Sequence, residues 1–166
     1  IIITMLPNGS SVEEVWISIL KNVKPNTLIV DCSTIDIKTS KKMHLIAKNI
    51  DIPSLDAPVS GGTIGAENGS LTFMVGGELE AFNKMLPLFN IMGSKSILCG
   101  EAGSGQATKI CNNLLLATSM VGLGEAIQLA NSNKLNMNKF YEVLSTSTSS
   151  CWALNNYFPI KGIGPT

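Results

Sequence analysis

The first hundred residues alternate between short apolar runs and stretches whose apolar residues recur at helical spacing. The apolar runs predict strands over residues 1–6, 27–32, 52–57, 71–75 and 95–99. The stretches between them predict helices, the clearest of which carries Val12, Val15, Trp16, Ile19 and Leu20. Strands that alternate with helices in this way indicate an α/β fold, with a largely parallel sheet and helices on its faces.

The pattern changes after Gly100, beyond which no strand is predicted. Helical spacing runs from Gly103 to about Ser132, and a further helix is predicted from Asn136 to Ser145. We therefore expect an α/β part over residues 1–100 and the beginning of an all-helical part over residues 101–166, with a long helix between the two domains.

The stretch from Leu114 to Ala130 is apolar enough to suggest a membrane span. It contains Glu125 and Gln128, however, and it falls short of the roughly 20 uninterrupted apolar residues that a span requires. We expect a buried helix and no membrane partner.

Composition excludes several classes of function. The 166 residues are 45% hydrophobic and 14% charged, which is typical of a globular chain. Twelve basic residues, all lysines, balance twelve acidic ones, so no nucleic-acid partner is expected. The four cysteines are too widely spaced for a metal knuckle or a disulfide framework, and no metal site is predicted. The single histidine, His44, lies in a lysine-rich stretch and is expected at the surface.

A glycine-rich segment follows the third predicted strand, from Asp56 through Pro58 to Ser60-Gly61-Gly62. A hydroxyl group and consecutive backbone N–H groups without side chains offer a concavity suited to a carboxylate. The alternative is a loop that only connects two strands.

A second glycine-rich segment opens the long helix, from Gly100 to Lys109. Its spacing, G-x-x-G-x-G, differs from the dinucleotide-binding fingerprint, and it follows the last predicted strand instead of the first. Lys109 and Asn113 are four residues apart, so they lie on one face of this helix. A lysine partly buried there would have a lowered pKa and could act as a general base, although an isolated lysine is more commonly exposed.

Two further positions lie just beyond predicted strands: Leu6-Pro7 after the first and Ser33-Thr34 after the second. Ligands of open α/β sheets bind outside the carboxyl ends of the strands, so these residues could contact a cofactor. They could equally be turn residues with no further role.

The two long motifs resemble those of the β-hydroxyacid dehydrogenase family, which includes 3-hydroxyisobutyrate dehydrogenase, 6-phosphogluconate dehydrogenase and tartronate semialdehyde reductase. The segment from Asp56 to Gly62, with Leu71 to Gly77 after it, resembles the family's substrate-binding motif. The segment from Gly100 to Asn113 resembles its catalytic motif. Lys109-Ile110-Cys111-Asn112-Asn113 and the late Cys151-Trp152 favour the hydroxyisobutyrate branch.

This resemblance implies the remainder of a Rossmann-like doubly wound sheet, followed by the start of a helical domain. It implies NAD as the cofactor and a small carboxylate as the substrate, with 3-hydroxyisobutyrate oxidised to methylmalonate semialdehyde in valine breakdown. Lys109 would be the catalytic base, while the substrate would be held by Ser60, Gly61, Gly62 and Asn113. The cofactor would be lined by Leu6, Pro7 and Thr34.

The resemblance also implies a homo-oligomer, dimer or tetramer, and a mitochondrial location in eukaryotes. The family's N-terminal G-x-G-x-x-G unit and a later lysine-aspartate motif fall outside these residues, so we interpret the chain as an internal piece of a longer protein, inactive by itself. Two alternatives stay open: a related enzyme acting on glyoxylate or tartronate semialdehyde, and a non-catalytic relative whose long helix serves subunit packing.

Overall fold

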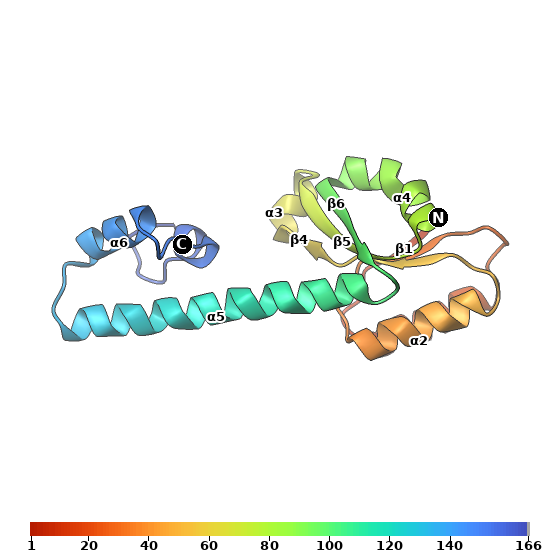
Figure 1. The fold of residues 1–166 in the computed structure, drawn as a ribbon, viewed down its shortest axis with the longest axis horizontal. Helices are drawn as coiled ribbons and strands as arrows, with labels where there is room; N and C mark the ends of the chain where they lie inside the picture. Colours follow the sequence, from red (N-terminus) through yellow and green to blue (C-terminus); the bar gives the residue numbers. More distant parts are fainter. Residues whose placement is uncertain (166) are drawn as a thin grey trace. The chain divides into compact units, whose positions relative to one another are not determined.

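The computed structural model describes residues 1–165 (Figure 1). The chain forms two compact units, Ile1–Ile110 and Cys111–Thr166, and helix α5 (Ser104–Ser132) begins in the first and continues into the second.

The first unit is built on a six-stranded sheet. Its strands are β1 (Ile2–Thr4), β2 (Ile29–Asp31), β3 (Ser54–Asp56), β4 (Val59–Ser60), β5 (Leu71–Gly77) and β6 (Gly93–Gly100). Strands β1, β2 and β3 are parallel to one another, as are β5 and β6. Strand β5 runs antiparallel to both β3 and β4, so the predicted α/β fold is confirmed and the sheet is mixed.

Two successive strands share one edge of β5. Leu55 and Asp56 of β3 pair with Gly77 and Gly76, and after Pro58 the strand β4 pairs with Phe73 and Thr72. The chain therefore follows β5 along its length before it turns at Gly61.

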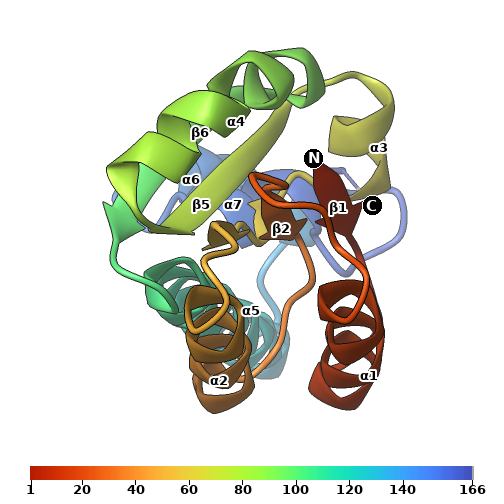
Figure 2. The same ribbon diagram turned by 90° about the vertical axis from the view of Figure 1, so that its right-hand side faces the viewer.

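Helices cover both faces of this sheet (Figure 2). They are α1 (Gly9–Leu20), α2 (Ile37–Lys48), α3 (Gly62–Glu67) and α4 (Leu79–Met92). Asn8 and Asp36 cap α1 and α2 through their side-chain oxygens, as these residue types favour. Alternation along β2 sends Ile29 into the core beneath α1 and α2, and Leu28 and Val30 into the core beneath α4.

The second unit is helical. Helices α6 (Met137–Thr146), capped by Asn136, and α7 (Trp152–Asn156) follow α5. Its core contains Leu123 and Ile127 of α5, together with Leu154 and Phe158. The long helix and the helical region after it are confirmed.

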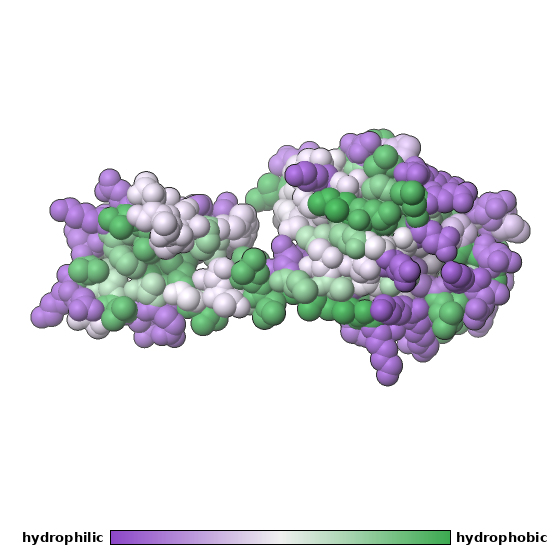
Figure 3. All heavy atoms as spheres, in the orientation of Figure 1, coloured by the Kyte–Doolittle hydropathy of each residue, from purple (hydrophilic) through white to green (hydrophobic). Residues whose placement is uncertain are grey.

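Helix α5 is apolar over much of its exposed surface, shown green in Figure 3. Leu114, Leu115 and Val121 are exposed, and only 6% of an apolar 18-residue stretch of this helix is buried. The expected burial of this helix is therefore wrong for residues 1–165, since these supply packing partners for one side only. By length and composition alone α5 could cross a membrane, a property that it shares with core helices of globular proteins.

Candidate active site

A buried hydrogen-bond network joins the carboxyl ends of β1 and β2. Thr4 Oγ1 and Ser33 Oγ donate to Asp31 Oδ1 at 2.8 and 2.6 Å. Trp16 Nε1 in turn donates to Thr4 Oγ1 at 3.1 Å, and Leu6 N donates to Ser33 Oγ at 2.7 Å. Burial raises the pKa of the Asp31 carboxyl, although the hydrogen bonds from Ser33 and Thr4 oppose the shift. The network fixes the two loops that follow these strands relative to each other.

The residues predicted to line the cofactor lie on these two loops. Leu6 is half-buried, whereas Pro7 and Thr34 are exposed. All three lie just beyond the carboxyl ends of parallel strands, where open α/β sheets bind nucleotides. Exposed residues on loops anchored by a buried network fit the edge of a dinucleotide site. Their contact with NAD stays a prediction.

The segment predicted to hold the substrate lies at the end of β4 and the start of α3. Gly61 and Gly62 have φ angles of 130° and 62°, values that favour glycine. A Cβ atom at Gly62 would meet nothing within 4 Å, so the space above this backbone is open. The two elements here escaped the sequence analysis because a two-residue strand and a six-residue helix are too short to show a period.

The first turn of α5 lies directly against the sheet. A Cβ atom at Gly105 would be 2.7 Å from Asp56 O and closer still to Met74 O. The Asp56 carboxylate accepts hydrogen bonds from Gly103 N at 2.7 Å and Gln106 N at 2.8 Å, which satisfies backbone donors at the start of the helix. Strand β3, which leads into the substrate segment, therefore also fixes the start of α5.

Lys109 lies one turn after Gly105, so it is on the side of α5 that faces the sheet. Its side chain is half-buried, and burial lowers its pKa. Asn113, one turn further along the helix, is exposed and accepts a hydrogen bond from Asn112 Nδ2 at 3.2 Å. Burial thus shifts the pKa of Lys109 in the direction that a lysine base requires, while the roles of Lys109 and Asn113 stay predictions.

The expectation that His44 lies at the surface is wrong. Its side chain is only 8% exposed, with Nδ1 2.7 Å from Ser54 Oγ and Nε2 3.2 Å from Asp56 Oδ1. His44 shares the buried face of α2 with Met43 and Ala47, and that helical spacing was the available signal. Burial raises the pKa of Asp56, but the nearby imidazole and the two backbone N–H donors together lower it below its usual value.

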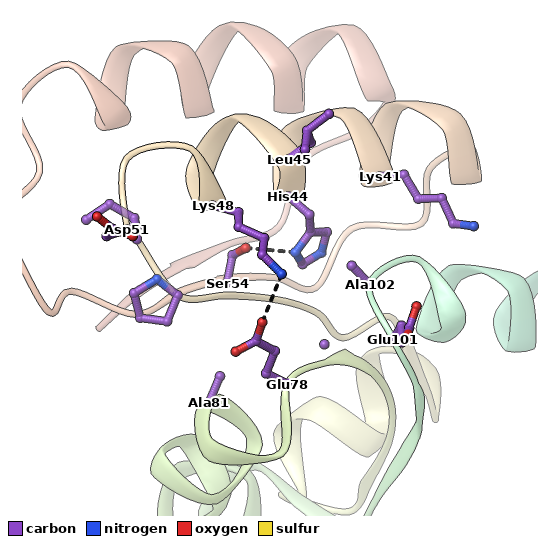
Figure 4. Close-up of a pocket in the computed structure, with 13 residues that line it drawn as sticks. Lys41, His44, Leu45, Lys48, Asp51, Ser54, Glu78, Ala81, Glu101 and Ala102 are labelled. Atoms are coloured by element: carbon purple, nitrogen blue, oxygen red, sulfur yellow. Dashed lines mark hydrogen bonds and ion pairs between the residues drawn. The ribbon is translucent and has the colours of Figure 1, made fainter.

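A cavity of about 760 Å³ opens between α2 and α4, with Lys48 and Glu78 3.4 Å apart at its edge (Figure 4). Its charged residues are Lys41, Lys48, Asp51, Glu78 and Glu101. This mixture favours no class of ligand. None of the residues predicted to bind substrate or cofactor lines this cavity, so it is separate from the candidate site.

Sequence reasoning missed two buried polar residues at the site, Asp31 and Gln106. Asp31 ends a strand in which every residue is buried, and Gln106 is a fully buried amide three residues before Lys109. Their positions, next to residues already singled out, were the only signals. Their partners are distant in sequence and no local pattern indicates them.

Comparison with known proteins places the two parts of the chain in one family. Residues 1–100 match the model of the NAD binding domain of 6-phosphogluconate dehydrogenase. Residues 103–162 match a model described as NAD-binding of NADP-dependent 3-hydroxyisobutyrate dehydrogenase. Both descriptions name a nicotinamide dinucleotide, which confirms the predicted cofactor.

Individual relatives are similar along nearly the whole chain. It is 42% identical to the NAD-dependent L-serine dehydrogenase of Pseudomonas aeruginosa, over 98% of this chain and 56% of that protein. It is 42% identical to the mitochondrial 3-hydroxyisobutyrate dehydrogenase of Mus musculus, over 98% of this chain and 49% of that protein. The chain thus spans about half the length of the curated relatives that it matches.

A solved structure agrees with these comparisons. The Mycobacterium tuberculosis 3-hydroxyisobutyrate dehydrogenase, solved with L-serine, superposes with a TM-score of 0.94 at 39% identity. The match covers 99% of this chain and 56% of that one.

Proposed function

Since the chain belongs to the dehydrogenase family that includes 3-hydroxyisobutyrate and 6-phosphogluconate dehydrogenases, we propose that its protein is an NAD-dependent oxidoreductase of small β-hydroxy acids. The observation that carries this proposal is the half-buried Lys109, whose pKa is lowered by burial. It lies on a helix whose first turn is bonded to Asp56, in the strand that leads to the Ser60 segment.

The proposed chemistry assigns one task to each group of residues. The neutral amine of Lys109 takes the proton of the substrate hydroxyl group, as a general base. Ser60, Gly61, Gly62 and Asn113 hold the substrate, with the glycine backbone N–H groups toward its carboxylate. Leu6, Pro7 and Thr34 would line a bound NAD, which would supply the acceptor for the hydride released by the carbon that carries the hydroxyl group.

Two substrates are supported by the relatives. The proposed reaction is the oxidation of 3-hydroxyisobutyrate to methylmalonate semialdehyde, a step of valine breakdown, because several similar curated proteins are named 3-hydroxyisobutyrate dehydrogenase. L-serine is the second candidate, since one relative is named for it and a solved relative was crystallised with it. Both are small carboxylates with a β-hydroxyl group, so the same base and the same carboxylate-binding segment can act on either.

NADH formation with a panel of hydroxy acids tests the proposal. The assay uses a full-length form. In it, this chain is joined to those segments of the M. tuberculosis relative that lie outside the matched region. We expect the highest kcat/KM for 3-hydroxyisobutyrate, a lower value for L-serine, and the lowest for glycerate and glycolate, the alcohols of tartronate semialdehyde and glyoxylate. A full-length form that binds NAD but oxidises none of these acids would show that the proposed activity is wrong.

The pH dependence of the reaction follows from the pKa of Lys109. Only the unprotonated amine can accept the hydroxyl proton, so kcat/KM is expected to rise as pH increases through this pKa. Because burial lowers the pKa, the rise should occur below the range of an exposed lysine. A pH profile of NADH formation measures it, and a rise only in the range of ordinary lysines would contradict the assigned base.

The assembly and location of the protein are also proposals. The exposed apolar residues Leu114, Leu115 and Val121 of α5 support a homo-oligomer, dimer or tetramer. A mitochondrial location is supported by eukaryotic relatives named mitochondrial, such as that of Dictyostelium discoideum, whereas other relatives are bacterial.

A further inference from the structure

Gln106 is a buried polar side chain to which the proposed chemistry assigns no task. It is 0% exposed and lies in the first turn of α5, three residues before Lys109. Burying a carboxamide is costly unless both its donor and its acceptor are paired. An apolar side chain would avoid that cost, so the partners of the amide indicate what it does.

Both ends of the Gln106 carboxamide bind the loop that carries Thr34. Its Nε2 donates to Ser33 O at 2.7 Å, and its Oε1 accepts from Ile35 N at 3.1 Å. These two backbone groups flank Thr34, the residue proposed to contact the cofactor. In the reverse orientation of the amide, its N–H donor would face the Ile35 N–H donor and its oxygen would face the Ser33 oxygen. Only one orientation therefore satisfies both partners.

The backbone of Gln106 also contacts strand β3. Its N–H group donates to Asp56 Oδ2 at 2.8 Å, and Asp56 is the last residue of β3, which leads to the substrate segment. One residue therefore connects the cofactor loop, the strand before the substrate segment and the helix of the proposed base. The first two of these lie 50 to 73 residues from Gln106 in sequence, and the third is its own helix.

We infer that Gln106 is a positioning residue, whose carboxamide sets the place of the Thr34 loop relative to the helix that carries Lys109. This inference rests on the proposed function, since Thr34 and Lys109 are the cofactor contact and the base in it. Small displacements of groups that orient reactants cost large factors in rate and binding. A donor–acceptor pair with one allowed orientation restricts such displacement more than an apolar contact does.

Two variants of Gln106 test this role through the dissociation constant for NAD, measured without substrate in the full-length form. Gln106→Leu fills a similar volume without the two hydrogen bonds, and we expect it to weaken NAD binding about tenfold at every pH, a factor at the lower end of what two lost net hydrogen bonds contribute. Each value is divided by that of the wild type at the same pH, which cancels the titration of other groups.

Gln106→Glu separates positioning from packing. When protonated, its O–H group can donate to Ser33 O while its carbonyl accepts from Ile35 N, which reproduces the native pattern. When ionised, a buried carboxylate faces Ser33 O, and both the burial and the facing carbonyl oxygen raise the pKa of the new acid. We expect NAD binding within about twofold of wild type at low pH, weakening about tenfold or more as pH rises through that pKa.

A matched control is Gln128→Glu, since Gln128 is an exposed glutamine on the same helix. It should bind NAD as the wild type does at every pH. A Gln106→Leu protein with the wild-type constant, or a Gln106→Glu protein whose constant relative to wild type is independent of pH, would overturn the inference. If the wild type binds NAD but oxidises no hydroxy acid, the proposed function fails, while these binding constants still decide the role of Gln106.

Discussion

Replacing Lys109 by alanine is expected to lower kcat for NADH formation by at least about a hundredfold, the usual contribution of a positioned general base. The dissociation constant for NAD should change little, because the residues proposed to line the cofactor are held by Asp31, Ser33 and Gln106. The loss should therefore appear in kcat, which steady-state kinetics with saturating NAD measures directly.

Two further lysine variants make this result specific. Lys109→Arg keeps a positive charge on a long side chain, but a guanidinium group does not lose its proton in proteins, so this variant should be as inactive as the alanine variant. Lys95→Ala removes an exposed lysine from β6 and should leave kcat unchanged. An active Lys109→Arg enzyme would assign to this residue an electrostatic role instead of proton transfer.

The sequence predicted those elements that carry a continuous apolar run or a helical period. The strands over residues 27–32 and 95–99 and the helix from Asn136 correspond to β2, β6 and α6. The direction of β5 could not be predicted, because it depends on how the chain returns along β3 and β4 after Pro58. Strand direction is a long-range property, and apolar runs contain no information on it.

The candidate site was predictable to the extent that its residues stand in contiguous motifs. Lys109 could be singled out because apolar residues follow it and a glycine-rich segment precedes it. The pairing of Gln106 with Ser33 and Ile35, and that of His44 with Asp56, joins separate segments of the chain. Such pairings require the fold, since a buried amide and a surface amide look the same in one sequence.

The burial of α5 was the clearest error, and its cause is physical. An apolar helix indicates that some partner covers it, but composition cannot say which chain or segment that partner is. Residues 1–165 cover the side with Leu123 and Ile127, and they leave Leu114 and Leu115 exposed.

Replacing Gly105 by alanine is expected to destabilise the protein by about 3 kcal/mol, a large effect for one added methyl group. The new Cβ would overlap Met74 O and lie 2.7 Å from Asp56 O, and backbone atoms of paired strands cannot move aside cheaply. The first turn of α5 would have to lift from the sheet, which would also strain the Gly103 and Gln106 hydrogen bonds to Asp56. Urea denaturation of the full-length form measures the change through the unfolding midpoint.

Gly122→Ala is the matched control for this substitution, because it adds the same methyl group to the same helix. A Cβ at Gly122 meets nothing within 4 Å among residues 1–165, and alanine favours a helix over glycine by about 1 kcal/mol, so this variant should be more stable than the wild type. A lower unfolding midpoint for Gly105→Ala and a higher one for Gly122→Ala would distinguish the effect of close packing from that of helix propensity. A Gly105→Ala protein that unfolds at the wild-type midpoint would mean that the helix of the proposed base does not rest on β3 and β5, and Lys109 would then lose its fixed place.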